Sequence, residues 1–270
     1  MLDLPENAKD RLIVALDVNT NKQALDIVDK LGENVTYYKV GWQLFFGGAA
    51  YELIKNLAQR GKKVFLDLKM EDIDTTIELT MKNAPVEFVE YVELLTLKGS
   101  GAGALVAAAK RGASHKRAEK LKFLMLTVLS SLDDSDIKAY GSTMTLEKLI
   151  KLNAKTALDA GCDGLIASGE SIRDLRNEFG DDFYIVAPGI RPDGVSTDDH
   201  KRSLTPYDAI SYGANYLVVG RPITKSDDPG KAALSVIADI ERALNDASTN
   251  PASDPHPEDS GNFQGMAHAM

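Results

Sequence analysis

The sequence contains little of the material from which covalent cross-links and metal centres are built. Its 270 residues include a single cysteine, Cys162, and only four histidines, two of them in the C-terminal tail. One cysteine excludes an intramolecular disulfide and is typical of proteins from a reducing compartment. So few histidines leave little material for a metal centre. We therefore expect neither a disulfide framework nor a bound metal ion.

Long apolar runs and a basic excess are also missing. No stretch approaches the ~18 uninterrupted apolar residues of a membrane-spanning helix, and residues 1–6 lack the basic and then apolar layout of a signal peptide. We therefore expect a cytoplasmic protein. The net charge of −9 argues against a general nucleic-acid binder, because such proteins carry basic faces. An anionic small substrate stays compatible with that charge if a local basic pocket receives it.

The sequence does contain a regular succession of apolar strands and helices. Apolar residues make up 44% and charged residues 26% of the chain, which is ordinary for a globular domain. Runs of β-branched and apolar residues predict strands at 11–17, 35–41, 63–69, 89–98, 123–130, 164–168, 183–187 and 216–219. Helical patterns follow the strands, among them 75–83, 146–160, 172–179, 206–212 and 230–244, with loops at 131–145 and 188–205.

Eight successive strand-then-helix units favour one architecture. Such units pair in parallel through right-handed crossovers, and eight of them close a barrel. We predict an α/β protein with a (β/α)8 TIM barrel, with a doubly wound open sheet as the alternative. Residues 1–246 are expected to form one catalytic barrel domain. Residues 247–270 are rich in Ser, Asn, Pro, Asp and Gly without apolar periodicity, which predicts a disordered tail.

Charged residues gather where the predicted strands end. Asp67 and Lys69 follow an apolar run, so alternation along the strand places both on one face, with Leu66 and Leu68 on the other. Unpaired buried charge is costly, so the pair belongs either to a surface salt-bridge cluster or to a functional site. In a barrel the strand ends converge on one mouth, and several charges of alternating sign there favour a functional site. Further polar strand ends are Asp17, Lys39, Lys98 and Ser130.

Two glycine-containing turns, 188–192 and 220–224, follow the seventh and eighth predicted strands. Loops at those positions of a barrel often bind phosphate through backbone N–H groups, and Arg221 can bind a phosphate with two parallel hydrogen bonds. The sequence offers no Ser-His-Asp or Cys-His arrangement and no dinucleotide fingerprint. The remaining prediction is proton transfer and electrostatic stabilisation on a phosphorylated substrate, without a cofactor.

These residues give the chain a resemblance to a known family across residues 11–244. The run Asp67–Asp72 has the pattern Asp-x-Lys-x-x-Asp and is followed by Ile73. Asp17 in Ala-Leu-Asp, Lys39 in Tyr-Lys-Val-Gly and the two glycine-containing turns stand in the expected order. Together they resemble the orotidine 5′-monophosphate decarboxylase family. The resemblance implies a cofactor-independent homodimer that releases CO2 from C6 of the orotate ring to leave UMP, in de novo pyrimidine biosynthesis.

The resemblance also implies the catalytic residues. Lys69 is the expected proton donor to C6, and Lys39 and Asp67 hold it in place. Asp72 is expected to enter from the neighbouring subunit and to complete an alternating array of lysines and aspartates. Carboxylates beside Lys69 favour its ammonium form, which is the form that a general acid requires.

Substrate contacts follow from the same resemblance. Asp17 and Lys39 are expected to bind the ribose hydroxyls together with the partner subunit's Thr76, and Ser130 is expected to contact the pyrimidine edge. The loop 188–205 is expected to close over the phosphate. The expected contacts of that end are Pro188, His200, Gly220 and Arg221.

The chain departs from the family pattern in places, and two other functions remain open. Lys98 stands where a histidine is usual, Asp74 and Thr75 replace a Pro-Asn pair, and His200 is the nearest counterpart of a phosphate-loop glutamine. Related Mg2+-dependent sugar-phosphate decarboxylases and aldolases share the barrel and the Asp-x-Lys-x-x-Asp run, which Ala-Gly follows there. A non-catalytic nucleotide-binding protein would keep the barrel without turnover.

Overall fold

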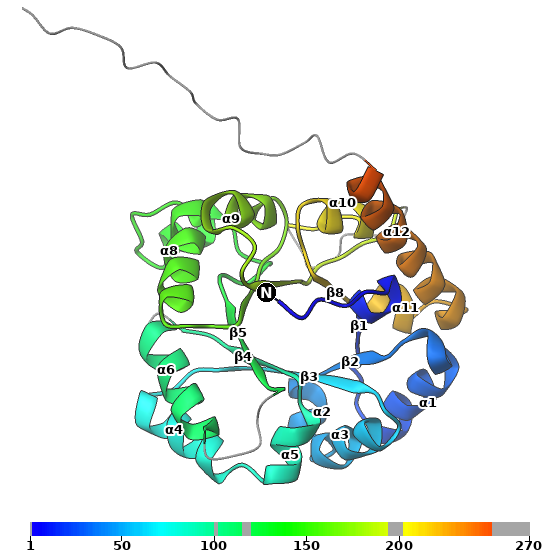
Figure 1. Ribbon diagram of the computed structural model, residues 1–270. Coiled ribbons are helices and arrows are strands. Elements are labelled where there is room, and N and C mark those ends of the chain that lie inside the picture. Colours follow the sequence, from blue (N-terminus) through cyan, green and yellow to red (C-terminus); the bar gives the residue numbers. More distant parts are fainter. Residues whose placement is uncertain (1, 100–101, 115–119, 194–201, 250–270) are drawn as a thin grey trace, which may run out of the picture.

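Eight parallel strands follow one another in a closed barrel, in which β1 pairs with both β2 and β8 (Figure 1). The computed structural model describes residues 2–99, 102–114, 120–193 and 202–249. The predicted TIM barrel is confirmed, and the doubly wound sheet is wrong. The strands are β1 (Leu12–Ala15), β2 (Tyr37–Gly41), β3 (Lys63–Met70), β4 (Leu94–Leu97), β5 (Lys122–Leu126), β6 (Gly164–Ile166), β7 (Tyr184–Ala187) and β8 (Tyr216–Val219).

Helices form a ring around the barrel (Figure 1). Two of the longer ones begin at a threonine whose hydroxyl accepts a backbone N–H, Thr20 from Gln23 and Thr145 from Lys148, which stabilises a helix start. The helices are α1 (Asn21–Leu31), α2 (Trp42–Phe46), α3 (Ala50–Gln59), α4 (Asp74–Asn83), α5 (Val86–Tyr91), α6 (Ala102–Ala113), α7 (Asp134–Ala139), α8 (Leu146–Asp159), α9 (Ser171–Phe179), α10 (Pro206–Ser211), α11 (Arg221–Thr224) and α12 (Pro229–Thr249), with 3-10 turns η1 (Ala8–Arg11) and η2 (Gly32–Asn34).

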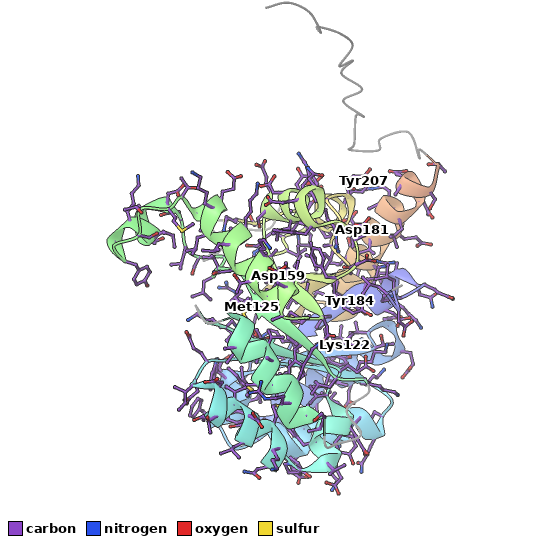
Figure 2. All side chains as sticks on the ribbon, turned by 60° about the vertical axis from the view of Figure 1, so that its left-hand side comes forward. Lys122, Met125, Asp159, Asp181, Tyr184 and Tyr207 are labelled. Carbon is purple, nitrogen blue, oxygen red and sulfur yellow. The ribbon has the colours of Figure 1, made fainter. Side chains whose placement is uncertain are left out.

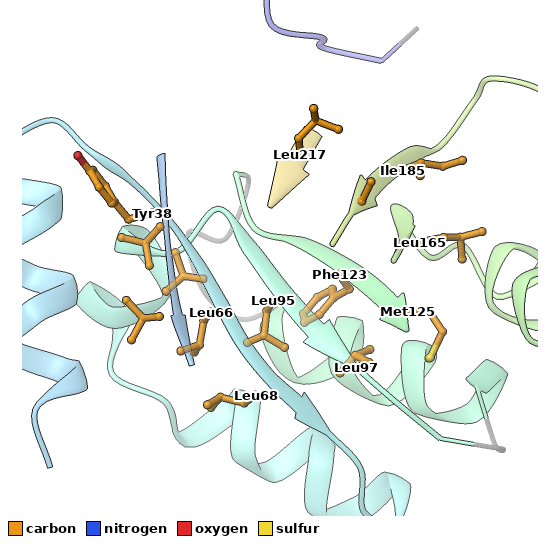
Figure 3. Packing of buried hydrophobic residues seen from close by; sticks show 14 of the residues in the cluster. Tyr38, Leu66, Leu68, Leu95, Leu97, Phe123, Met125, Leu165, Ile185 and Leu217 are labelled. Atoms are coloured by element: carbon orange, nitrogen blue, oxygen red, sulfur yellow. The ribbon is translucent and has the colours of Figure 1, made fainter. Parts of the chain in front are cut away.

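Alternate residues along the strands fill two apolar layers. Outward-facing side chains such as Leu66 and Leu68 pack under the helices in one large cluster (Figure 3). Inward-facing side chains such as Phe65 fill the barrel interior. Burial on both faces is characteristic of a parallel sheet covered by helices. On β3 the alternation places Asp67 and Lys69 on the inner side with Phe65, as the sequence predicted.

Aromatic side chains close the mouth at the N-terminal ends of the strands. The ring of Tyr216 lies 5.9 Å from that of Tyr37 and 6.0 Å from that of Tyr184, measured between centroids. The hydroxyl of Tyr184 donates to the carbonyl of Asp3 at 3.3 Å, so the N-terminal segment lies across this end. Figure 2 shows Tyr184 and Lys122, the first residues of β7 and β5, at the same end of the barrel. A site must therefore open at the opposite mouth.

An amphipathic helix replaces the first half of the predicted fourth strand. The strand expected at 89–98 is wrong there, because residues 86–91 form α5 and β4 begins only at Leu94. Val89 is buried and its neighbour Phe88 is partly buried, while Glu87 and Glu90 on either side are exposed. Two adjacent residues on the covered side fit a helix better than the strict alternation of a half-buried strand. The apolar and β-branched composition of this run favoured the incorrect prediction of a strand.

Other boundaries also shift. The loop expected at 131–145 contains α7, which begins with a capping box between Asp133 and Asp136. The last helix, α12, runs to Thr249, past the expected domain end at 246. The rest of the predicted tail, 250–270, lies outside the described residues. No helix within the described ranges is long and apolar enough to cross a membrane.

Candidate active site

A cavity of about 680 Å3 opens at the C-terminal ends of the strands. Its floor is apolar and consists of inward-facing barrel side chains, including Phe65, Ile166 and Val218. A concave site with an apolar floor and a few convergent polar groups is typical of small-molecule binding. The walls bring together these predicted site residues: Asp17, Lys39, Asp67, Lys69, Ser130, Pro188, Gly220 and Arg221.

Four of these residues form a chain of alternating charge. The Nζ of Lys39 lies 2.9 Å from Oδ1 of Asp17 and 3.5 Å from Oδ2 of Asp67. The Nζ of Lys69 lies 2.8 Å from both carboxylate oxygens of Asp67. Lys39 and Asp67 are each only 9% exposed. The side chain of Lys69 is 27% exposed, so the alternative of a surface salt-bridge cluster is wrong for Asp67 and Lys69.

Burial and charge pairing act in opposite directions on the two innermost groups. Burial lowers the pKa of Lys39, but Asp67 and then Asp17 raise it, and the net pKa lies above the ordinary value of lysine. Burial raises the pKa of Asp67, but Lys39 and Lys69 together outweigh it, and the net pKa lies below the ordinary value of aspartate. Both groups therefore carry their charge at neutral pH.

These pKa directions define the pH range in which the array contributes to stability. The pKa of Asp67 is depressed, so its contribution is present above the ordinary carboxyl pKa and is lost as the pH falls through the folded-state pKa. The pKa of Lys39 is raised, so its contribution is present below the ordinary lysine pKa and is lost as the pH rises through the folded-state pKa. Lys39 and Asp67 are both charged between those limits.

A buried threonine that sequence reasoning missed supports Asp67. The Oγ1 of Thr96, on β4, donates to Oδ1 of Asp67 at 2.9 Å, and the side chain is 0% exposed. Alternation offered a signal, because Thr96 lies two residues after the inward-facing Leu94 and so shares its face. A hydrogen bond to the charged form helps to keep Asp67 ionised.

The backbone is strained where it presents Lys69. Its φ is 49°, the left-handed region that residues other than glycine rarely adopt. The pairing register of β3 with β4 also shifts between Leu66 and Met70. Strain of this kind costs roughly 1–3 kcal/mol and persists only where the surrounding structure imposes it. At Lys69 it accompanies the turn of the ammonium group towards Asp67.

Two predicted catalytic and binding residues lie outside the cavity of their own chain. Asp72 and Thr76 are both exposed. The Oδ1 of Asp72 accepts the backbone N–H of Ile73 at 2.7 Å. Thr76 lines a separate, mainly apolar groove with residues that include Phe45 and Leu79. The monomer therefore does not bring Asp72 and Thr76 together with Lys69.

Two further expected residues also fall elsewhere. Lys98 does not line the cavity, and its Nζ lies 3.4 Å from Oε2 of Glu71 in a half-exposed ion pair. The expectation that Lys98 joins the charged mouth is wrong, because a carboxylate outside the cavity holds it. His200 lies outside the described residues, so its role stays a prediction.

The cavity wall also contains polar residues that the sequence did not single out. Gln43 comes from α2, a helix that was not predicted, and Arg191 and Lys225 come from the two glycine-containing turns or directly after them. The two glycine-containing turns were the sequence feature that could have indicated Arg191 and Lys225 as cavity residues. Nothing in the composition of α2 marked Gln43.

Comparison with known proteins places the chain in a family. The sequence model of the orotidine 5′-phosphate decarboxylase / HUMPS family matches residues 10–236. The chain belongs to this family. The match to the orotidine 5′-phosphate decarboxylase / HUMPS family begins before β1 and ends after β8, so it includes every described residue of the cavity wall.

Individual members of the family align over nearly their whole length. Orotidine 5′-phosphate decarboxylase from Rhodopseudomonas palustris strain BisB5 is 41% identical over 235 residues, which cover 87% of this chain and 96% of that protein. The protein of that name from Methylobacterium nodulans is 38% identical over 243 residues, or 90% of this chain and 100% of that protein. The crystal structure of orotidine 5′-phosphate decarboxylase from Lactobacillus acidophilus has a TM-score of 0.74 at 33% identity, covering 86% of this chain and 99% of that chain.

Proposed function

We propose that this member of the orotidine 5′-phosphate decarboxylase family converts orotidine 5′-monophosphate to UMP and CO2, in de novo pyrimidine biosynthesis. The observation that carries the proposal is the alternating array of Asp17, Lys39, Asp67 and Lys69 in the cavity. Relatives that match over nearly their whole length bear the name orotidine 5′-phosphate decarboxylase. A cation fixed in a cavity with an apolar floor is suited to stabilise negative charge that develops on a bound ring.

The remaining wall residues suit the rest of a nucleotide. Asp17 and Lys39, which already exchange a hydrogen bond, offer an acceptor and a donor for ribose hydroxyls. Ser130 provides a hydroxyl for the pyrimidine edge. Gly220 and Arg221 provide a backbone N–H and a guanidinium for the phosphate, at the strand position where barrels often bind that group. Binding energy gained at the phosphate can position the ring at the array.

The chemistry requires only this chain's side chains. The bond between C6 and the carboxylate carbon breaks, CO2 leaves, and the electron pair remains on C6. The ammonium group of Lys69 stabilises that negative charge and then transfers a proton to C6, which gives UMP and a neutral lysine that regains its proton from water. Both carboxylate oxygens of Asp67 accept from Nζ of Lys69 at 2.8 Å, which holds that group in position before the reaction.

A second copy of the chain completes the array in this proposal. Asp72 and Thr76 are exposed and do not line their own cavity, and Thr76 lines an apolar groove. A contiguous apolar surface of this kind is typical of a protein interface. We propose a homodimer in which each subunit supplies Asp72 and Thr76 to its partner. Exposed apolar side chains that line the groove include Phe45, Tyr51 and Leu79, and the exposed rings of Trp42 and Phe46 pack on Phe45.

The cytoplasm is the proposed location. Cys162 is 6% exposed, and burial raises the pKa of its thiol to about 11. A thiol in that state is inert as a nucleophile. A single buried cysteine fits a reducing compartment.

Chelation distinguishes the proposed reaction from Mg2+-dependent sugar-phosphate chemistry. Asp17 and Asp67 are both paired with the ammonium group of Lys39, and such a neighbour repels a divalent cation. We expect CO2 release from orotidine 5′-monophosphate to be unchanged after dialysis against EDTA. The assay monitors conversion to UMP in metal-free buffer. Loss of activity that added Mg2+ restores would overturn the cofactor-independent mechanism.

The same assay addresses a non-catalytic role. Two departures suggested this role, Lys98 and the missing phosphate-loop glutamine, whose nearest counterpart, His200, lies outside the described residues. Lys98 lies in an ion pair outside the cavity, so it leaves the catalytic array unchanged. We therefore expect turnover. Tight UMP binding without release of CO2 would establish a nucleotide-binding protein instead.

Thr96→Val tests the support of Asp67. Loss of the hydroxyl removes one hydrogen bond to the carboxylate, and we expect kcat/KM to fall by roughly 10- to 100-fold, since a hydrogen bond to a charged group contributes ~1.5–3 kcal/mol. Thr36→Val is the matched control, because the hydroxyl of Thr36 donates to Oδ1 of Asp10 at 2.8 Å, outside the cavity. Both variants should lose stability in thermal unfolding, and only Thr96→Val should lose activity. Equal kcat/KM in the two variants would contradict this role.

A further inference from the structure

The segment that follows β5 belongs to no strand or helix, although the backbone N–H of its first residue, Thr127, still donates to the carbonyl of Ile166 at 3.3 Å. β5 ends at Leu126, and the chain from Thr127 to Ser131 then passes along the cavity wall, to which Leu129, Ser130 and Ser131 contribute. The fifth strand predicted to end at 130 is therefore too long. Backbone carbonyls outside regular structure need other donors. The partners of these carbonyls determine where Ser130 lies.

Side chains from distant elements provide those donors. The Nδ2 of Asn153, on α8, donates to the carbonyl of Thr127 at 2.8 Å. The guanidinium of Arg202 donates to the next two carbonyls, to Leu129 at 2.8 Å and to Val128 at 3.3 Å. Charged donors make stronger hydrogen bonds than neutral ones. The carbonyl of Leu129 also accepts the backbone N–H of Leu132 at 3.1 Å, and Arg202 is the side chain that bonds to both residues directly before Ser130.

Arg202 is itself held by its neighbours. A Cβ atom built on Gly169, which has a φ of +66° in the loop after β6, would lie 3.1 Å from Cβ of Arg202. The stem of Arg202 thus packs against a residue that has no side chain. Two residues further on, the carbonyl of Leu204 accepts the backbone N–H of Arg191, a cavity residue, at 2.9 Å. Arg202 therefore stands between the wall formed after β5 and the wall formed after β7.

We propose that Arg202 is a positioning residue, which holds Ser130 at the distance from the Pro188–Arg191 wall that the bound nucleotide requires. The assignment rests on the proposed function and deepens it. Arg202 does not line the cavity, so it acts through the carbonyls of Val128 and Leu129 rather than by touching the substrate.

Arg202→Ala is expected to raise KM for orotidine 5′-monophosphate and Kd for UMP by about tenfold. This factor corresponds to the loss of one hydrogen bond, the one between a displaced Ser130 and the pyrimidine edge. The change in kcat should be smaller, because Ser130 contacts the ring in both the ground state and the transition state. Arg202→Lys keeps the stem against Gly169 and one charged donor, so it should recover part of the affinity. If Arg202→Ala fails to fold, Arg202→Lys still carries the test.

A double-mutant cycle separates positioning from a general loss of stability. If Arg202 acts through Ser130, Ser130→Ala combined with Arg202→Ala should bind UMP no more weakly than the weaker single variant. Fully additive losses would overturn the proposal. The same cycle with Arg202→Lys gives the answer when the alanine variant is unstable.

Arg173→Ala is the control. Arg173 lies on the neighbouring helix α9, where its guanidinium packs over the ring of Tyr212 at 3.8 Å and does not line the cavity. We expect unchanged KM and kcat for this variant. If the wild-type protein releases CO2 but the losses of UMP affinity in the double-mutant cycle are additive, only the role of Arg202 is overturned. If UMP binding shows the predicted coupling between Arg202 and Ser130 but the wild-type protein releases no CO2, the proposed reaction is overturned and the positioning role of Arg202 remains.

Discussion

Lys69→Ala is expected to lower kcat for CO2 release by about 10⁴-fold or more, because it removes both the proton donor and the cation beside the developing charge. Affinity for UMP should change far less, since ribose, phosphate and pyrimidine contacts come from other wall residues. Asp67 keeps Lys39 and Thr96 as partners, so the fold should persist. Steady-state kinetics, UMP titration and thermal unfolding measure the three expectations.

Lys63→Ala provides a matched control on the same strand. Lys63 is the first residue of β3, where its Nζ lies 3.6 Å from Oε2 of Glu93, and it belongs to the opposite mouth from Lys69. We expect it to retain wild-type kcat. A Lys69→Ala variant whose kcat stays within tenfold of the wild type would remove the proton-donor mechanism.

The fold was predictable because its signal is repeated. Eight strand-then-helix units point to a barrel even where one boundary is wrong, as at Val89, and a period of two along β3 is enough to place Asp67 and Lys69 inward. The error at Val89 has a physical cause. Apolar and β-branched residues fit a short helix against the barrel as well as a strand, and what distinguishes the two is that the adjacent residues Phe88 and Val89 are both covered.

The site was predictable to the extent that strand ends define it. Asp17, Lys39 and Ser130 follow strands, and the closed barrel gathers them at one mouth. Thr96 was missed because a single threonine inside an apolar strand carries no sign of the carboxylate it supports. The φ of 49° at Lys69 was also inaccessible, since no glycine marks it and the surrounding structure imposes it.

Asp72 marks a different limit, because its role depends on a second molecule. Sequence alternation ends with β3 at Met70, and in the monomer Asp72 is exposed and bonded to the N–H of Ile73. We expect Asp72→Ala to lower kcat by about 10²-fold or more, as for loss of a preorganised charged group. Its dimer should remain intact in gel filtration, because the apolar groove supplies most of the proposed contact.

Mixing the two inactive variants shows whether the carboxylate of Asp72 acts in the site of its own subunit or in that of its partner. When Lys69→Ala and Asp72→Ala chains exchange subunits at equal amounts, half of the dimers are mixed, and each mixed dimer has one site with Lys69 from one chain and Asp72 from the other. Activity should therefore recover to roughly one quarter of the wild type. Subunit exchange is checked separately with differently tagged chains. Exchange without recovery would show that Asp72 does not act across the interface.

A second mixture also tests whether Asp72 acts across the interface, but through a loss of activity rather than a gain. Wild-type chain is exchanged with a chain that carries both Lys69→Ala and Asp72→Ala. If Asp72 acts across the interface, both sites of a mixed dimer lack one residue, and activity per site falls to roughly one quarter. If Asp72 acts within its own chain, each mixed dimer keeps one complete site, and roughly one half remains. Because Asp72 is exposed and does not line the cavity of its own chain, we expect the lower value.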